Sequence, residues 1–246
     1  MITLKNVSCK MSGKQILDGI TATFNKGEIW GIIGPPGCGK SMLMKLICGL
    51  YPVTDGDLYI ESENIAGMSE VRLVPVRRKI GMLFQNNALF DFMNVWENVA
   101  FPLSRMNSGL SPEEIRLKAF ERLKAVGLGG SEEKMPSELS GGMRKRVGVA
   151  RAIITEPPVI IYDEPTAGLD PVTTSKIYDL LNEIQSRSQS VVLTISSDII
   201  GLRSFVKNIL FINEGKILYC GPEQEIDHCT DPVVYQFLRG LDEGPL

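Results

Sequence analysis

A glycine-rich stretch, GPPGCGKS at 34–41, has the residue types and the spacing that suit the binding of phosphate groups. Its glycines let the backbone curl so that N–H groups point inward at phosphate oxygens, and a helix beginning here would add a favourable dipole. Lys40 supplies a positive charge for the terminal phosphates of a nucleotide, and the Ser41 hydroxyl is a suitable ligand for Mg²⁺. The residues expected to cradle the phosphates are Gly34, Pro35, Pro36, Gly37, Cys38, Gly39, Lys40, Ser41 and Met42.

Two acidic residues end a second apolar run, VIIYDE at 159–164. The apolar residues would form a buried strand that carries Asp163 and Glu164 to its carboxyl end. There Asp163 can hold Mg²⁺, and Glu164 can orient or deprotonate a water molecule that attacks a phosphate. Because this pair accompanies a phosphate loop, it predicts a site that hydrolyses a nucleoside triphosphate.

The elements that must position these residues alternate between strands and helices. Period-two alternation and short apolar runs predict strands at 2–11, 16–25, 28–33, 159–165 and 190–196, and a hairpin at 208–221. Helical patterns cover 41–50, 111–126, 140–154 and 171–187. Ser111, Pro112 and Glu114 form the start expected of the second of these helices. The alternation indicates an α/β fold with a mostly parallel core sheet.

The whole chain, 1–246, is expected to form a single domain with an insertion. Residues 1–87 and 158–246 would make the core and an N-terminal antiparallel β-subdomain. Residues 88–157 would form an inserted α-helical subdomain, and residues 231–246 a C-terminal tail.

Composition excludes several classes of protein. The formal net charge of -3 provides no global basic field for nucleic acid, so no nucleic-acid partner is expected. No apolar run reaches the roughly 18 residues that span a bilayer, and the start MITLKNVSCK resembles neither a signal peptide nor a transit peptide. The five cysteines lack CxxC spacing, which favours a reducing compartment over a disulfide framework. We therefore expect a cytosolic protein that reaches a membrane only through a partner.

LSGG at 139–142, together with the phosphate loop, Gln85 and DEPTAGLD at 163–170, makes the chain resemble the nucleotide-binding subunit of an ABC transporter over nearly its whole length. The resemblance implies an ABC-type P-loop NTPase fold, ATP and Mg²⁺ as ligands, and ATP hydrolysis coupled to transmembrane transport. It also implies a homodimer that sandwiches two ATP molecules. The turn of Ser140, Gly141 and Gly142 would then face the γ-phosphate held by the other subunit, as a helix N-terminus suits an anion.

The resemblance also implies roles for single residues. Gln85 would touch Mg²⁺ and sense the γ-phosphate, Glu164 would be the catalytic base, and Asp170 would face its counterpart across the dimer. The implied metal-binding residues are Ser41, Gln85 and Asp163. This chain departs from the family in having Met143 after LSGG in place of glutamine. It also offers Met11 or Lys10 where the family often stacks an aromatic residue on adenine, which indicates loose base selectivity.

The stretch TISSDII at 194–200 raises a question about the rate of hydrolysis. In the family, the corresponding turn carries a histidine that reaches the γ-phosphate and the attacking water. Here Ser197 stands in its place, and the only histidine in the sequence, His228, is expected to be an exposed surface residue. Losing one preorganised donor to a transition state costs about a hundred- to a thousandfold in rate. We therefore expect intact ATP binding and slow hydrolysis.

Three segments carry a narrower resemblance, to the ATPase subunit of Mla-type phospholipid transport systems: 88–103, 135–143 and 234–246. In these systems of the bacterial envelope, a permease works with lipid-binding MCE proteins. The resemblance implies a peripheral location at the cytoplasmic face of the inner membrane, an MCE protein in the complex and permease docking on 88–103, and leaves open a small regulatory subunit. It also implies that the tail packs against the neighbouring subunit. The side chains that would line the docking groove, or else belong to the subdomain core, are Phe90, Phe92, Val95, Trp96 and Phe101.

Three alternative functions stay open at this point. The chain could be the ATPase of an ABC importer for a polar solute, although segment 88–103 and the tail argue against this. It could be a soluble ABC ATPase of DNA repair or translation, although those usually have tandem or longer chains and a basic face. The missing histidine keeps open a weakly hydrolysing or non-hydrolysing, ATP-gated structural dimer.

Overall fold

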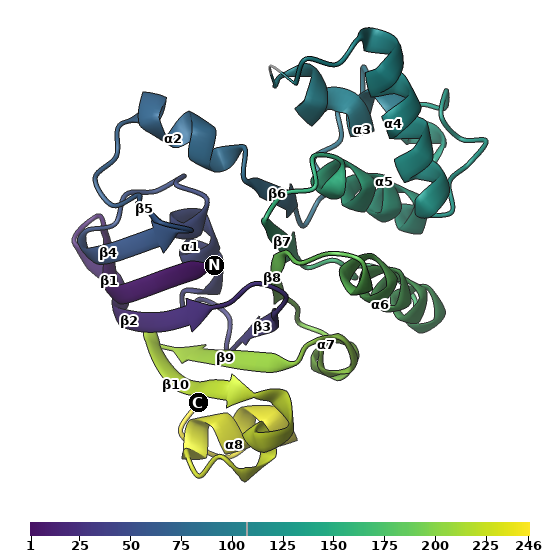
Figure 1. Ribbon diagram of the computed structural model, residues 1–246. Coiled ribbons are helices and arrows are strands. Elements are labelled where there is room, and N and C mark those ends of the chain that lie inside the picture. Colours follow the sequence, from purple (N-terminus) through teal and green to yellow (C-terminus); the bar gives the residue numbers. More distant parts are fainter. Residues whose placement is uncertain (107) are drawn as a thin grey trace.

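The computed structural model describes residues 1–106 and 108–246, in which ten strands form two sheets (Figure 1). The strands are β1 (Ile2–Met11), β2 (Lys14–Phe24), β3 (Ile29–Ile33), β4 (Asp55–Ile60), β5 (Glu63–Asn64), β6 (Ile80–Leu83), β7 (Val159–Asp163), β8 (Val191–Ile195), β9 (Asn208–Asn213) and β10 (Lys216–Pro222). The α-helices are α1 (Lys40–Ile47), α2 (Glu70–Arg77), α3 (Val95–Ser104), α4 (Pro112–Ala125), α5 (Gly141–Ile153), α6 (Pro171–Ser186), α7 (Ile199–Phe205) and α8 (Pro232–Arg239). Two 3₁₀ helices are η1 (Pro136–Glu138) and η2 (Glu223–His228). Within the described ranges, every helix is too short or too polar to cross a membrane.

The larger sheet has the strand order β10-β9-β3-β8-β7-β6, and its neighbours are parallel except for the hairpin of β9 and β10. Its central strands are buried on both faces, which is why their sequences are continuous apolar runs. Because side chains alternate between faces, Ile160 and Tyr162 pack under the helices α6 and α7, whereas Ile161 packs toward α1 and the smaller sheet. The smaller, antiparallel sheet has the order β2-β1-β4-β5. The predicted mostly parallel core and antiparallel β-subdomain are therefore confirmed.

The register of the parallel strands brings the carboxyl ends of four strands to one edge of the sheet. Ile195 of β8 is opposite both Ile32 of β3 and Asp163 of β7, and Leu83 of β6 is opposite Tyr162. The segments that follow these strands therefore begin side by side, and they contain the phosphate loop, Ser197, Glu164 and Gln85.

The helices α3, α4 and α5 form a unit beside the β6 end of the larger sheet (Figure 1). Helix α4 begins as the sequence predicts, because Ser111 Oγ accepts a hydrogen bond from the backbone N–H of Glu114, and the Glu114 carboxylate accepts one from Ser111. Helix α3 begins with a similar capping box at Asn94 and Glu97. Buried Asn98 fixes the loop before α3 by donating to the carbonyl oxygens of Phe90, Met93 and Asn94.

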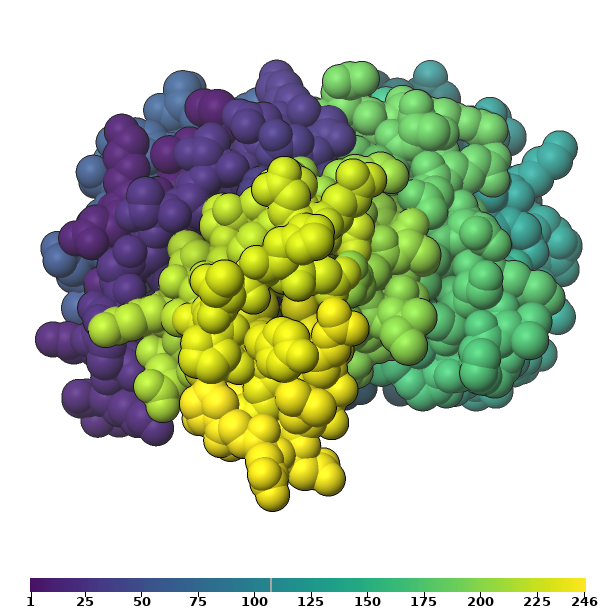
Figure 2. Space-filling view, turned by 90° about the horizontal axis from the view of Figure 1, so that it is seen from below, coloured from purple at the N-terminus to yellow at the C-terminus, as the bar shows by residue number. Residues whose placement is uncertain are grey.

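The C-terminal residues return to the larger sheet. Helix α8 packs on its own chain, with Val234 fully buried and the Phe237 ring 5.2 Å from the ring of Phe211 in β9. Figure 2 shows this segment, in yellow, across the middle of the lower face, between the purple N-terminal segment and green residues from the second half of the chain. His228 lies exposed at the end of η2, as expected. Contact between the tail and a neighbouring subunit remains a prediction.

Candidate active site

Three glycines shape the loop between β3 and α1. Gly34, Gly37 and Gly39 have φ values of 142°, 77° and 116°, which residues with a side chain rarely adopt. A Cβ atom on Gly34 would lie 2.0 Å from the carbonyl oxygen of Ile212, and one on Gly39 would lie 2.7 Å from a methyl of Leu17. The loop therefore has the curled backbone that the sequence predicts, and it is moulded against β2 and β9.

The side chains of the loop differ in how they are placed. The Lys40 ammonium donates hydrogen bonds to the carbonyl oxygens of Gly34 and Pro35, at 2.7 and 2.8 Å, and so lies over the loop. Ser41 is exposed in the first turn of α1. Cys38 and Met42 are buried, with 6% and 8% exposure, so they can offer a nucleotide little beyond their backbone N–H groups.

Asp163 ends β7 in a partly buried position. Burial raises the pKa of its carboxyl above the ordinary value, and the neighbouring Glu164 raises it further, while Lys145 and Lys45 oppose the shift. A bound cation would relieve this unfavourable placement of negative charge. Carboxylate and hydroxyl oxygens are also the ligands that Mg²⁺ prefers, so Asp163 and Ser41 fit a magnesium site.

Glu164 is held at three points. Its φ is +50°, an unusual conformation for a residue with a side chain, which costs roughly 1–2 kcal/mol. Its backbone N–H donates to the carbonyl oxygen of Ile195 at 2.9 Å, and its own carbonyl oxygen accepts from the Lys145 ammonium at 2.9 Å. Its carboxylate oxygen Oε2 accepts from both the backbone N–H and the hydroxyl of Ser197, each at 3.0 Å. Ser197 thus contacts Glu164 directly, a contact that the sequence does not reveal.

Gln85 is exposed just beyond β6. Its carbonyl oxygen accepts a 2.6 Å hydrogen bond from the Lys145 ammonium, which also reaches Glu164. Lys145 is only 3% exposed, and burial lowers its pKa while Glu164 and Asp163 raise it. The segment after Gln85 is held by a second buried cation of α5, Arg151, which donates to the carbonyl oxygens of Asn87 and Ala88.

The turn at 140–142 packs against the start of α6. Ser140 is the N-cap of α5 and accepts a hydrogen bond from the backbone N–H of Met143 at 3.3 Å. A Cβ atom on Gly142 would lie 2.9 Å from Thr173. Asp170 is the exposed N-cap of α6, and hydrogen bonds from the hydroxyl and backbone N–H of Thr173 lower its pKa. The structure thus brings the 140–142 turn and Asp170 together on one surface.

An apolar groove of about 620 Å³ lies between α2, β6, the segment after β6, α3 and α5. Phe90 and Phe101 line it, with ring centroids 4.6 Å apart, and Arg78 and Arg105 add positive charge. Helix α2 also lines this groove, which the sequence does not predict.

Three of the five side chains that were expected to line the groove, or else to belong to the subdomain core, do not line the groove. Val95 is fully buried in the core between the helices, because it is the first residue of α3 and faces inward. Trp96 packs on α4, where its ring lies 6.4 Å from that of Phe120 and under the guanidinium of Arg116. Phe92 is 77% exposed beside Phe90 and does not line the groove.

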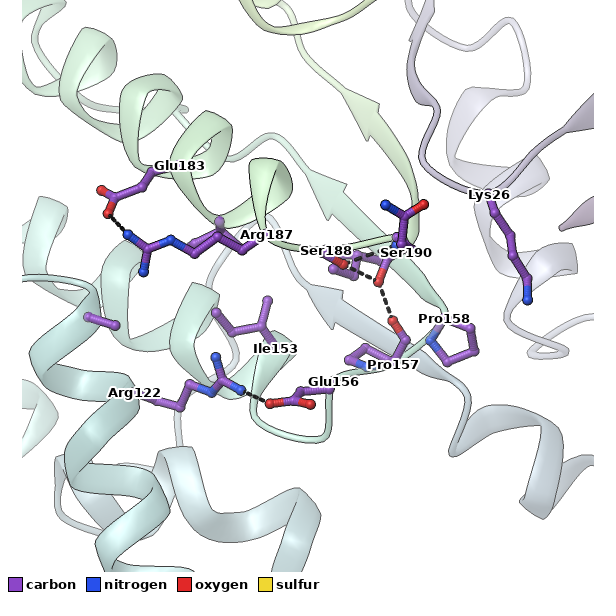
Figure 3. Close-up of a pocket in the computed structure, with 14 residues that line it drawn as sticks. Lys26, Arg122, Ile153, Glu156, Pro157, Pro158, Glu183, Arg187, Ser188 and Ser190 are labelled. Carbon is purple, nitrogen blue, oxygen red and sulfur yellow. Dashed lines mark hydrogen bonds and ion pairs between the residues drawn. The ribbon is translucent and has the colours of Figure 1, made fainter.

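A second cavity, of about 520 Å³, lies before the amino ends of β7 and β8, at the sheet edge opposite the phosphate loop (Figure 3). Its charged side chains are largely paired with each other, as Arg122 is with Glu156 and Arg187 with Glu183. Ser190 donates to the carbonyl oxygen of Pro157 at 2.6 Å. These groups satisfy one another, and nothing in the cavity points to a ligand.

Known proteins share both the sequence and the fold. The sequence profile of the ABC transporter family matches residues 17–167, and the chain belongs to this family. It is therefore an ATPase of the ABC type, coupled to transport, and the expected fold and family are confirmed.

Three relatives match this chain along its whole length. It is 38% identical to the intermembrane phospholipid transport system ATP-binding protein MlaF of Escherichia coli, of which the match covers 91%. It is 37% identical to the chloroplastic protein TRIGALACTOSYLDIACYLGLYCEROL 3 of Arabidopsis thaliana, with 75% covered. It is 36% identical to the probable ribonucleotide transport ATP-binding protein mkl of Mycobacterium leprae, with 70% covered.

Two solved structures show the same fold. A dimeric ATP-binding cassette in a post-hydrolysis state with ADP and phosphate has a TM-score of 0.82 and 33% identity, covering 91% of this chain and 99% of that one. A component of the cbiONQ transporter complex of Clostridium perfringens has a TM-score of 0.85 and 30% identity, covering 92% of this chain and 90% of that one.

Proposed function

We propose that this chain energises the transport of phospholipids between membranes of a bacterial envelope. The observation that carries the proposal is the full-length similarity to MlaF, which is named as the ATP-binding protein of a phospholipid transport system. The M. leprae relative is named for ribonucleotides, so a polar cargo is the alternative to test.

The site suggests how each residue contributes to ATP hydrolysis. The phosphate loop and Lys40 would bind the phosphates, and Ser41, Asp163 and Gln85 would hold Mg²⁺. The ion would supply positive charge to neutralise the phosphates. The Glu164 carboxylate orients and deprotonates the attacking water. Ser197, through its two hydrogen bonds to Oε2, fixes the direction of that carboxylate. Because the Ser197 hydroxyl already donates its hydrogen bond to Glu164, it is not free to donate to the γ-phosphate, which supports slow hydrolysis. The weakly hydrolysing, ATP-gated dimer therefore stays a second candidate.

A homodimer would complete the site. Ser140 and Gly141 are exposed at the N-terminus of α5, where an anion from a second subunit can approach. Asp170 lies on the same surface, so it would meet its counterpart there. The solved cassette with bound ADP and phosphate is described as a dimer, which supports this arrangement.

The apolar groove is the proposed docking site for the permease. Its apolar lining and the nearby arginines suit a short amphipathic helix with acidic residues at its border. Docking there would hold the chain at the cytoplasmic face of the inner membrane as a peripheral subunit. An MCE protein and a small regulatory subunit would complete the assembly.

Reconstitution with the permease tests the proposal. The chain and its permease are placed in phosphatidylethanolamine–phosphatidylglycerol vesicles, and ATP-dependent transfer of a labelled phospholipid to acceptor vesicles is measured, with Glu164→Gln as the inactive control. Transfer that needs ATP and Glu164 supports the proposal. ATP turnover that is stimulated by a ribonucleotide and not by phospholipid would favour the polar cargo.

A charge reversal in the apolar groove tests whether the permease docks there. Arg105→Glu reverses an exposed charge at the groove and should weaken binding to the permease at least tenfold, about 1.4 kcal/mol. Lys118→Glu, an exposed position on α4 outside the groove, is the matched control. Equal loss of binding in both variants would contradict the groove as the docking site.

A further inference from the structure

We propose that Lys145 is a positioning residue for ATP hydrolysis, which fixes the main chain of Glu164 relative to that of Gln85. The inference rests on the proposed role of Glu164. The Lys145 ammonium donates to the carbonyl oxygen of Gln85 at 2.6 Å and to that of Glu164 at 2.9 Å. It thereby joins α5, the segment after β6 and the end of β7, three places that are far apart in sequence.

The burial of this charge needs an explanation. A lysine with 3% exposure has lost most of its hydration, and an unpaired buried charge is costly. Two carbonyl oxygens and the nearby negative charges of Glu164 and Asp163 compensate this cost. An apolar side chain of similar length could fill the same space without that cost, so packing alone does not account for a lysine here.

The carbonyl group that Lys145 holds belongs to the residue whose orientation matters most. Glu164 has an unfavourable positive φ, and its conformation persists because the surroundings fix it. Ile195 holds its N–H group, Ser197 holds its carboxylate, and Lys145 holds its carbonyl group. The backbone N–H of Ala167 also donates to this carbonyl oxygen, at 3.3 Å, so without Lys145 only this longer bond holds the peptide after Glu164. The peptide can then shift, and the carboxylate can move relative to the attacking water. A displacement of about 1 Å at a reacting group can cost about a hundredfold in rate.

The same helix holds the segment beside the groove. Arg151, six residues after Lys145, donates to the carbonyl oxygens of Asn87 and Ala88, and its guanidinium lies 6.0 Å from the ring centroid of Phe90. Residues 85–88 are therefore fixed to α5 at both ends. Lys145 is the point where this unit meets the main chain of Glu164.

The first test compares ATP turnover with ATP affinity. Lys145→Met should lower kcat about 10- to 100-fold, because the main chain of Glu164 is no longer fixed relative to that of Gln85. The Kd for a fluorescent ATP analogue should stay within about threefold, because the phosphate loop is unchanged. Lys145→Arg should recover most of kcat, since guanidinium groups also donate to two carbonyl oxygens. Lys118→Met, which removes an exposed lysine of α4, is the control for charge. Equal losses of ATP affinity and of thermal stability in Lys145→Met, without a specific loss of kcat, would show a structural role only and overturn the proposal.

The second test is a double-mutant cycle with Glu164→Gln, measured by single-turnover hydrolysis. If Lys145 acts through Glu164, the double variant should be no slower than Glu164→Gln alone. A further tenfold loss in the double variant would overturn the proposal. If Lys145→Met does not fold, Lys145→Gln replaces it in both tests, with kcat expected between those of the arginine variant and Glu164→Gln.

The two proposals can fail separately. If Glu164→Gln hydrolyses ATP at the unsubstituted rate, the role of Glu164 is wrong and the inference about Lys145 falls with it. If Glu164→Gln abolishes turnover but Lys145→Met does not slow it, only the inference about Lys145 is wrong.

Discussion

Replacing Ser197 with histidine should accelerate ATP hydrolysis. Ser197 is exposed two residues beyond β8, at the edge where Asp163 ends β7 and Glu164 follows it, so a larger side chain has room there. A preorganised donor to transition-state charge is worth about a hundred- to a thousandfold in rate. The substitution also removes the 3.0 Å hydrogen bond from the Ser197 hydroxyl to Glu164, while the bond from the backbone N–H stays.

The magnitude follows from these two opposing terms. A hydrogen bond to a charged group contributes about 1.5 kcal/mol, which corresponds to about tenfold in rate if it orients the base. The net gain expected for Ser197→His is therefore about 10- to 100-fold in kcat. Ser197→Ala, which loses the hydroxyl and gains no donor, should be up to about tenfold slower than the unsubstituted protein.

The assay is steady-state phosphate release at saturating ATP and Mg²⁺, with Glu164→Gln as the lower limit. ATP affinity is measured for each variant, because the phosphate loop should bind equally in all of them. A Ser197→His variant that binds ATP normally but turns over within twofold of the unsubstituted protein would refute the reasoning. An unsubstituted rate equal to that of Glu164→Gln would favour the ATP-gated dimer.

Three further predictions concern the loop, the cysteines and pH. Gly34→Ala should destabilise the fold by about 3 kcal/mol or more, because the Cβ atom of the alanine would overlap a main-chain oxygen of β9. A titration should show that ATP binding is abolished, and a normal melting temperature would contradict this prediction. A thiol reagent should modify exposed Cys220 before buried Cys38. In a Cys220→Ser variant, where mass spectrometry monitors the modification of Cys38, that modification should block ATP binding. Arg203→Met should lower the free energy of unfolding by on the order of 1 kcal/mol at pH 7. Because the hydrogen bond from Arg203 holds the pKa of Asp227 below its ordinary value, this contribution is complete above that ordinary value and is lost as pH falls through the folded pKa. Chemical denaturation at pH 7 and pH 3 should therefore show a difference between variant and unsubstituted protein that shrinks in acid, and a constant difference would exclude this ion pair as the cause.

Local signals account for the parts of the fold that could be predicted. The apolar runs of β3, β7 and β8 are buried on both faces, and the phosphate loop is a contiguous motif, so neither depends on unknown contacts. Helix α2 was not predicted, because Pro75 lies inside it and argues against a helix. Its formation depends on tertiary burial of Leu73 and Val76, which no local pattern specifies.

The candidate site, like the fold, could be predicted only in part. Its motif residues could be named from the sequence, but the contacts that orient them could not. The signal for Lys145 was present, since it lies four and seven residues before Val149 and Ala152 and so shares the buried face of α5. What the sequence could not specify is that two carbonyl oxygens from distant segments meet that side chain.

The close packing of the phosphate loop on β9 has a consequence for how the chain is made. Gly34 lies against Ile212, and the backbone N–H of Gly215 donates to the carbonyl oxygen of Cys38 at 3.0 Å. Strand β3, which leads into the loop, pairs on both sides with strands that are translated more than 150 residues later. The loop therefore leaves the ribosome early but can reach its final shape only after the β9–β10 hairpin has emerged. A nascent chain stalled before residue 208 should fail to bind ATP, although every residue of its phosphate-binding motif has been synthesised.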